Sequence, residues 1–229
     1  MSSDIAYIRF GLFPGDPETL AHFEKFMKAH AKAQTLIIDI RGHRGGGLAE
    51  MDILFSHIFN KQTDLLYFET RKSVDEAGAS PIKAGITVLD IEGLGGVVRR
   101  KHIALPHEHP LMANTKIFIL MSGYTASAAE HLSLAMKRTK RGVLVGETTR
   151  GGAHFGGTVD LEYGYHVFIP VGRAFNPDTG KDWEGTGVVP DIPVDAKRAL
   201  IVALVNAGLE EEQATIINSS LNYTPPKAP

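Results

Sequence analysis

The chain has no cysteine among its 229 residues. This absence excludes disulfide bonds, thiol nucleophiles and metal sites with cysteine ligands. The sequence also lacks an apolar run of the ~18–20 residues that a membrane-spanning helix needs, and its start lacks the basic and apolar regions of a signal peptide. The formal net charge is only −2, which gives no reason to expect nucleic acid or an anionic membrane as a partner. We therefore expect no membrane span and no nucleic-acid site.

What the chain does contain is the composition of an ordinary globular protein. Hydrophobic residues make up 43% and charged residues 22%, enough apolar material for one sizeable core at this length. We predict a single core domain over residues 1–223, with a variable, insertion-like region at 64–110 inside it. The proline-rich end, 224–229, is predicted to be a flexible tail.

Strand and helix patterns alternate along the chain. Continuous or alternating apolar runs predict strands at 5–10, 35–40, 65–70, 97–105, 116–120 and 142–146, and a hairpin with strands at 158–161 and 165–171. Apolar residues at helical spacing predict helices at 18–33, 51–58, 128–137, 196–206 and 210–218. Because strands alternate with helices, the sequence predicts an α/β fold with a largely buried sheet.

The most informative stretch is 121–130, Met-Ser-Gly-Tyr-Thr-Ala-Ser-Ala-Ala-Glu. It places Ser127 where a buried strand turns into an alanine-rich helix. Free backbone N–H groups and the positive end of the helix dipole favour a developing negative charge there, so Ser127 is a candidate nucleophile. The competing interpretation is structural, because Ser127 and Glu130 have the spacing of a capping box.

A second feature is the run Gly45-Gly46-Gly47 between a predicted strand and a predicted helix. Glycine lets backbone N–H groups approach a ligand without steric cost. A phosphate-binding loop is excluded by detail, because neither Gly-Lys-Ser/Thr nor the pattern G-x-G-x-x-G is present. A purely structural tight turn stays open. Together, two strand-to-helix turns can place two donors around one oxygen.

Four ordered blocks, at 36–47, 125–130, 145–154 and 183–191, resemble the carboxy-terminal processing (tail-specific) serine peptidases. The closer resemblance is to the branch related to interphotoreceptor retinoid-binding protein and the tricorn core protease, and it covers about residues 5–195. It implies a ClpP/crotonase-like spiral of β-β-α units and a peptide or protein substrate. It also implies Ser127 as nucleophile, with N–H groups of Ala128 and of Gly45 or Gly46 as the oxyanion hole. We expect no cofactor and no metal.

The general base is the point at which the sequence departs from this family. The lysine used by the processing peptidases falls at Gly152, which argues against a Ser–Lys dyad. The tricorn-like branch uses a histidine from before the first strand, in a region that we expect this chain to lack, together with a glutamate that corresponds to Glu184. We expect such an upstream histidine to be the base, oriented by Glu184. Within the chain, the candidates are His154 and then His43, whereas His131 is expected to face away from Ser127.

Other functions also stay open at this stage. A noncatalytic binding module for an apolar ligand or a peptide tail fits the same fold. A crotonase-type acyl-CoA enzyme shares the two-amide oxyanion hole but gives no reason for a serine at position 127. His102, His107 and His109 suggest zinc by their spacing, yet nothing nearby completes a ligand set. Family members are often exported or periplasmic, whereas this sequence leaves location and oligomeric state open.

Overall fold

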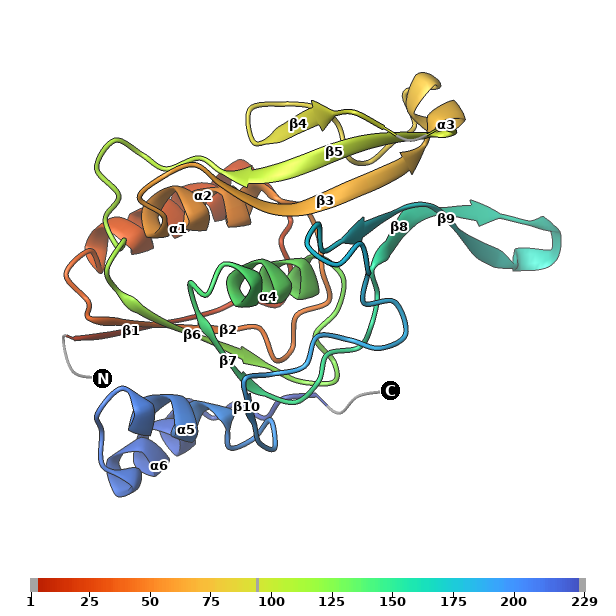
Figure 1. The fold of residues 1–229 in the computed structure, drawn as a ribbon. Coiled ribbons are helices and arrows are strands. Elements are labelled where there is room, and N and C mark those ends of the chain that lie inside the picture. Colours follow the sequence, from red (N-terminus) through yellow and green to blue (C-terminus); the bar gives the residue numbers. More distant parts are fainter. Residues whose placement is uncertain (1–3, 94, 227–229) are drawn as a thin grey trace.

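The computed structural model describes residues 4–93 and 95–226 of the chain. Within them lie a five-stranded parallel sheet and a five-stranded antiparallel sheet, with helices between the sheets and below the parallel one (Figure 1). This arrangement confirms the predicted α/β class.

The parallel sheet has the strand order β1-β2-β6-β7-β10. Its strands are β1 (Ile5–Arg9), β2 (Thr35–Asp39), β6 (Lys116–Met121), β7 (Val143–Gly146) and β10 (Ile192–Pro193). In the centre of the sheet, Ile37 of β2 lies opposite Phe118 of β6. The two strand-to-helix turns singled out from the sequence follow these neighbouring central strands, so both turns emerge at the same edge of the sheet.

Both faces of the parallel sheet are buried, because successive side chains of a strand point to opposite faces. Leu36 and Ile38 belong to a core shared with three helices, whereas Ile37 between them belongs to a second core on the other face. The first face is covered by α1 (Pro17–Ala29), α2 (Ala49–Ile58) and α4 (Ala128–Arg138), and the second by α5 (Ala199–Asn206) and α6 (Glu211–Ser220) (Figure 1). The continuous apolar pattern of β2 is thus explained by burial on two sides.

The antiparallel sheet has the order β4-β5-β3-β9-β8. Its strands are β3 (Thr63–Arg71), β4 (Val88–Ile91), β5 (Val97–Ala104), β8 (His154–Asp160) and β9 (His166–Phe175); a short helix α3 (Lys72–Glu76) follows β3, and a 3₁₀ turn (Glu162–Gly164) joins β8 to β9. The region at 64–110 supplies most of β3 and all of β4 and β5, and Leu65 and Leu66 are fully buried in the main core. That this region varies among relatives stays a prediction.

The helix predicted at 18–33 and the hairpin predicted at 158–171 differ most from the structure. The helix predicted at 18–33 ends at Ala29, because the next residues form a turn in which the Ala33 N–H donates to the His30 carbonyl. Its start agrees, with Asp16 capping the Thr19 N–H. The hairpin predicted at 158–171 spans 154–175, because β9 continues past β8 to pair with β3. The sequence pattern does not predict α3, β4 or β10, which are all short.

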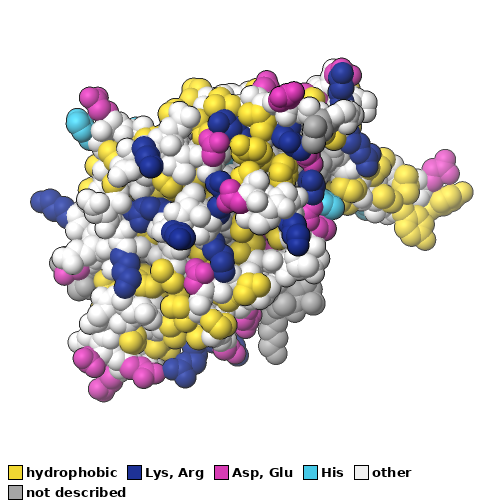
Figure 2. Space-filling view, in the orientation of Figure 1, with side chains coloured by type: hydrophobic (Ala, Val, Ile, Leu, Met, Phe, Trp, Pro, Cys, Tyr) yellow, Lys and Arg dark blue, Asp and Glu magenta, His cyan; other side chains and the backbone are white. Residues whose placement is uncertain are grey.

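The outer part of the β8–β9 hairpin projects from the body of the molecule (Figure 1), and Figure 2 shows its hydrophobic side chains on the surface. Among them, Tyr163 is 92% exposed. Of the predicted flexible tail, residues 227–229 lie outside the described residues, and Pro225 is buried. Between residues 4 and 226, leaving out 94, the structure contains no helix with the length and apolar character to cross a membrane.

Candidate active site

Ser127 lies at the first turn of α4 with an unusual backbone. Its φ is 57° and its ψ is −122°, a conformation that side-chain-bearing residues adopt only under strain from their surroundings. The residue is exposed, although Ala128 and the rest of the first turn are buried. A strained turn between strand and helix therefore holds this hydroxyl at the surface, as a nucleophile requires.

The glycine turn after β2 passes against this side chain. A Cβ atom on Gly45 would lie 2.7 Å from the Ser127 Cβ and 3.0 Å from its Oγ, and one on Gly46 would lie 2.1 Å from the Phe13 carbonyl oxygen. Both glycines also have positive φ, 114° and 130°. Only glycine fits at these positions. The Ala126 N–H, which donates to the His43 carbonyl at 3.0 Å, ties the two turns together.

The backbone N–H groups around Ser127 are not equivalent. The Gly45 N–H donates to His43 Nδ1 at 3.0 Å and is therefore occupied. The N–H groups of Gly46 and Ala128 have no hydrogen-bond partner within residues 4–93 and 95–226. Ala128 is buried and Gly46 is exposed, and an amide that has no protein partner is a donor available to a ligand.

His43 is buried beside the Phe13 ring, 4.1 Å between ring centroids. Burial lowers the pKa of His43 to about 4, so the ring is neutral near pH 7. Because Nδ1 accepts the Gly45 N–H, Nε2 carries the proton, and this buried atom has no partner in the described part of the chain. The contacts of His43 therefore order the glycine turn.

Acidification is expected to destabilise the protein through this ring. Between pH 6.5 and about 4 the unfolded chain binds a proton on His43 that the folded chain does not bind, so stability is complete above this range and falls as the pH drops through it. The expected contribution is about 2 kcal/mol between pH 7 and pH 5. Urea unfolding at both values should show this loss reduced in His43→Asn, which keeps an acceptor near Nδ1 but does not titrate. An equal loss in both proteins would contradict the assignment.

Glu130 accepts more hydrogen bonds than the capping box predicted from the sequence requires. Its buried carboxylate accepts hydrogen bonds from the Ser127 N–H at 2.8 Å and the Thr149 hydroxyl at 2.6 Å. It also accepts from the N–H groups of Gly151 and Gly152, at 2.6 and 2.8 Å. Glu130 thus also binds the loop that leads into β8, and it fixes the position of Ser127 relative to that loop.

The structure brings His154 and Glu184 together, and His154 lines two cavities with Ser127. One oxygen of Glu184, Oε2, accepts the N–H groups of Ala153 and His154 at 2.7 and 2.9 Å. The His154 ring lies between two carboxylates, with Nδ1 3.8 Å from Glu184 Oε2 and Nε2 3.6 Å from Asp182 Oδ2. The sequence placed His154 in a loop, whereas it is the first residue of β8.

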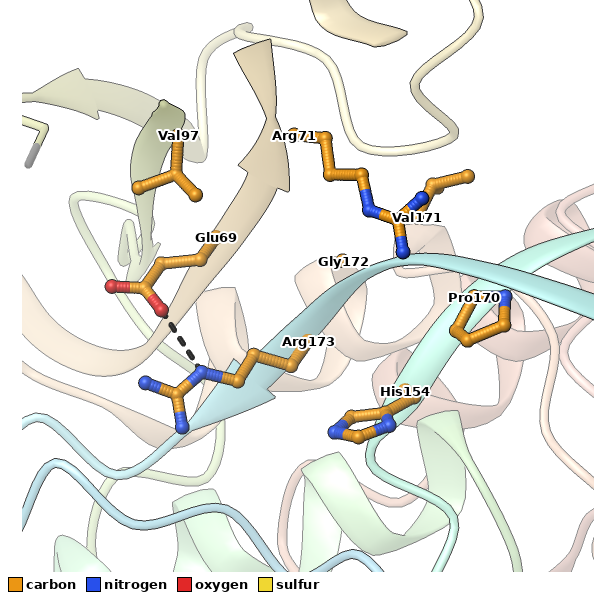
Figure 3. Close-up of a pocket in the computed structure, with 8 residues that line it drawn as sticks. All are labelled: Glu69, Arg71, Val97, His154, Pro170, Val171, Gly172 and Arg173. Carbon is orange, nitrogen blue, oxygen red and sulfur yellow. Dashed lines mark hydrogen bonds and ion pairs between the residues drawn. The ribbon is translucent and has the colours of Figure 1, made fainter. Parts of the chain in front are cut away.

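Asp182 connects His154 to an ion-pair network. Arg173 donates to Asp182 at 3.1 Å and to Glu69 at 2.9 Å, and Figure 3 shows the Glu69–Arg173 pair on the side of β9 where His154 also lies. Burial raises the pKa of Asp182, but hydrogen bonds from Arg173 and from the Glu184 N–H, with the charge of Arg173, outweigh it and leave the pKa lowered. The carboxylate beside His154 is therefore ionised at neutral pH.

Three cavities meet at these residues. The largest, of about 630 Å³, is lined by Ser127, His154 and apolar side chains that include Phe155 and Phe168. A smaller one of about 70 Å³ shares Ser127 and His154 and reaches Trp183. The third, of about 260 Å³, lies between His154 and the Glu69–Arg173 pair (Figure 3). Ser127 and His154 thus line two of these three cavities together.

Other candidates from the sequence lie elsewhere or have other contacts. His131, expected to face away from Ser127, lines the same small cavity and bonds to His102. In the part of the chain that the structure describes, no side chain hydrogen-bonds the Ser127 hydroxyl.

The zinc set suggested by sequence spacing does not assemble. His102 is buried beside His131, whereas His107 lies with Glu24 and His57. The ligand atoms of these last three residues lie within 4.8 Å of one another, the one group of this kind among the described residues. None of the three lines the cavities at Ser127.

A family model, a relative and a solved structure that match this chain all belong to the same class of protein. The model of peptidase family S41 matches residues 4–194. The chloroplastic C-terminal processing peptidase of Tetradesmus obliquus is 26% identical over 191 residues, which cover 83% of this chain and 35% of that protein. A solved photosystem II D1 C-terminal processing protease is 26% identical with a TM-score of 0.60, covering 84% of this chain and 42% of the other.

The structure of mature CPAF shares the fold, with a TM-score of 0.68 at 16% identity over 90% of this chain and 52% of that one. These likenesses confirm the predicted peptidase core fold. The chain spans less than half the length of the two processing peptidases that it matches.

Proposed function

Because the chain belongs to peptidase family S41, we propose that it hydrolyses peptide bonds with the Ser127 hydroxyl as nucleophile. The observation that carries this proposal is the strained, exposed Ser127 at the start of α4, against which the Gly45–Gly46 turn packs. A helix cap needs neither the positive φ nor the exposure. The family is one of peptidases, which argues against the acyl-CoA alternative.

The proposed oxyanion hole consists of the N–H groups of Gly46 and Ala128. Neither donates to another described residue, whereas the Gly45 N–H donates to His43. Gly45 therefore serves the site through its missing side chain, which leaves room for Ser127. Fixed donors of this kind stabilise the negative charge that develops on the substrate carbonyl oxygen in the transition state.

The proposed base is His154, oriented by Glu184. His154 lines both cavities that Ser127 lines, and its Nδ1 lies on the side of Glu184. Its Nε2, the atom that must take the serine proton, lies 3.6 Å from Asp182 Oδ2, so the proposal requires the ring to leave that contact. Its Nδ1 is 3.8 Å from Glu184 Oε2, and such contacts commonly tighten when substrate binds. The competing base is the histidine of an upstream segment that the family resemblance implies.

The proposed reaction has two steps. The Ser127 oxygen forms a bond to the substrate carbonyl carbon while its proton passes to His154, and Gly46 and Ala128 hold the resulting oxyanion. The carbon–nitrogen bond then breaks, and His154 returns the proton to the leaving amine, which leaves an acyl group on Ser127. Water, deprotonated by the same base, releases that group and restores the enzyme.

The proposed substrate is a peptide or the carboxyl-terminal segment of a protein. Two relatives carry C-terminal processing in their names. The cavity of about 630 Å³ is lined mainly by apolar residues, among them Ile82, Val88 and Phe155, which suits apolar side chains of an extended peptide.

Labelling with a fluorophosphonate tests the proposal. We expect the probe to modify Ser127 of the wild-type chain and to give no adduct with Ser127→Ala, as mass spectrometry of the tryptic peptides can show. Ser219→Ala, at an exposed serine of α6, is the matched control and should label like the wild type. A folded wild-type protein that stays unlabelled would contradict the proposal.

The noncatalytic binding module stays the second candidate, because no described side chain hydrogen-bonds the Ser127 hydroxyl. A binding protein would be stabilised against heat by an apolar ligand or a peptide. The same stabilisation in Ser127→Ala, together with an unlabelled wild type, would favour it.

A further inference from the structure

Glu24, His57 and His107 come together from three separate segments of the chain. Glu24 lies on α1, His57 in the last turn of α2, and His107 in the loop after β5. Helices α1 and α2 lie side by side (Figure 1). One potential ligand atom of each residue lies within 4.8 Å of the other two. Because none of the three lines a cavity at Ser127, this cluster is separate from the proposed catalytic site.

One residue of the cluster is buried and the other two reach solvent. His57 is 3% exposed, and its Nε2 lies 3.0 Å from Glu24 Oε2. The Glu24 side chain is 28% exposed, and His107 is exposed. The rings of His57 and His107 pack with their centroids 4.6 Å apart. An ion can therefore approach the carboxylate and the imidazoles from solution without opening the core.

Backbone contacts fix the loop that carries His107. The His107 N–H donates to the Ser56 carbonyl at 3.0 Å, and the Met112 N–H donates to the His57 carbonyl at 2.9 Å. Arg141 donates to the Met112 carbonyl and to the carbonyl of the last residue of α2, both at 2.7 Å. The loop is thus attached at two points to the end of α2. Ligands that are held in place before binding lose little freedom when an ion arrives.

All three side chains have atoms available for an ion. The His107 ring makes no hydrogen bond or ion pair to another residue of 4–93 or 95–226. Glu24 Oε1 pairs with Lys28 at 3.0 Å, but the Lys28 side chain is 66% exposed, and such pairs are weak. The Glu24 carboxylate only accepts, so His57 Nε2 donates a proton to it, and this proton leaves when the nitrogen binds a metal.

The chemistry of this ligand set favours zinc. Zn²⁺ binds imidazole nitrogen and carboxylate oxygen at about 2.0–2.2 Å, often with three protein ligands and a water, so neighbouring ligand atoms lie ~3.3 Å apart. The 3.0 Å between Glu24 and His57 is already close to this value, and rotation of the exposed His107 side chain brings in the third ligand. Calcium and magnesium prefer oxygen ligands. The position near the C-terminal end of α2 also favours a cation.

We propose that Glu24, His57 and His107 bind one zinc ion, with water as the fourth ligand. The ion links α1, α2 and the loop after β5, and it stabilises the packing of two helices that cover one face of the parallel sheet. The proposal is independent of the peptidase function, because Ser127 takes no part in it.

Calorimetric titration of the metal-free chain with zinc chloride tests the site. We expect one ion per chain in the wild type and at least about tenfold weaker binding in His107→Ala, since even the loss of a partner that only orients a ligand costs 10–100-fold. His109→Ala changes an exposed histidine of the same loop and should bind zinc like the wild type. A wild type that binds no zinc would overturn the proposal. So would equal affinity in the wild type and His107→Ala, because the zinc would then occupy other surface groups.

Glu24→Gln tests the carboxylate ligand in the same way, with Glu18→Gln, an exposed position of α1, as its matched control. Thermal unfolding gives a second readout. Zinc at about 100-fold above its Kd should raise the Tm of the wild type and of Glu18→Gln by about 5–10 °C, because the ion binds the folded chain. At the same concentration, Glu24→Gln should show about half of this rise or less. An equal rise in both variants, or none in the wild type, would contradict the assigned ligands.

Discussion

Replacing His154 by glutamine is expected to slow acylation of Ser127 by a factor of about 10²–10⁴, the usual contribution of a general base. Glutamine keeps a polar side chain and leaves the backbone N–H bond to Glu184 Oε2 in place, but it cannot take the serine proton. The measurement is kcat/KM with a fluorogenic peptide, or the second-order rate of fluorophosphonate inactivation where turnover is slow.

The hairpin itself offers the control for this substitution. His166 lies on β9, is exposed, and pairs with Asp160 at 2.6 Å, so His166→Gln makes the same chemical change away from Ser127 and should leave the rate unaltered. Glu184→Gln should reduce kcat less than His154→Gln does. If the His154 variant acylates as fast as the wild type, the base is not on β8, and a histidine from an upstream segment becomes the leading candidate.

Replacing Glu130 by glutamine is expected to lower the free energy of unfolding by about 2–5 kcal/mol, since each buried group left unpaired costs about 1–3 kcal/mol. Four donors point at this carboxylate, three of them backbone N–H groups around Ser127 and the loop before β8. The amide NH₂ of glutamine would face at least one of these donors. The positive end of the α4 dipole would also lose its anion.

Urea unfolding measures this loss, and fluorophosphonate labelling follows the position of Ser127 in the same variant. Glu212→Gln, an exposed position in the first turn of α6, is the matched control and should change stability by less than about 0.5 kcal/mol. We expect the Glu130 variant to label more slowly even where it is fully folded, because the strained Ser127 loses its N–H bond. A loss below about 1 kcal/mol with full labelling would show that the carboxylate is not needed to hold the turn.

Much of the fold follows from short-range pattern. The apolar run at 35–40 becomes a strand buried on both faces, and the helical spacing at 128–137 becomes α4. The helix that was expected to reach Ala33 stops at Ala29 because a turn at His30 competes successfully with further helix. Boundaries of this kind depend on small differences in free energy between local conformations.

By itself, the sequence determined that the chain alternates strands and helices, that Ser127 begins a helix after a buried strand, and that glycines follow the neighbouring strand. These are properties of consecutive residues, because periodicity and allowed backbone angles are local. Only the tertiary structure decided that the Gly45 N–H donates to His43, that Glu130 accepts hydrogen bonds from four donors, and that His102 lies within hydrogen-bonding distance of both Asp52 and His131. The last of these links residues 50 and 29 positions apart in the chain, and no local pattern records which distant side chains folding will bring within hydrogen-bonding distance.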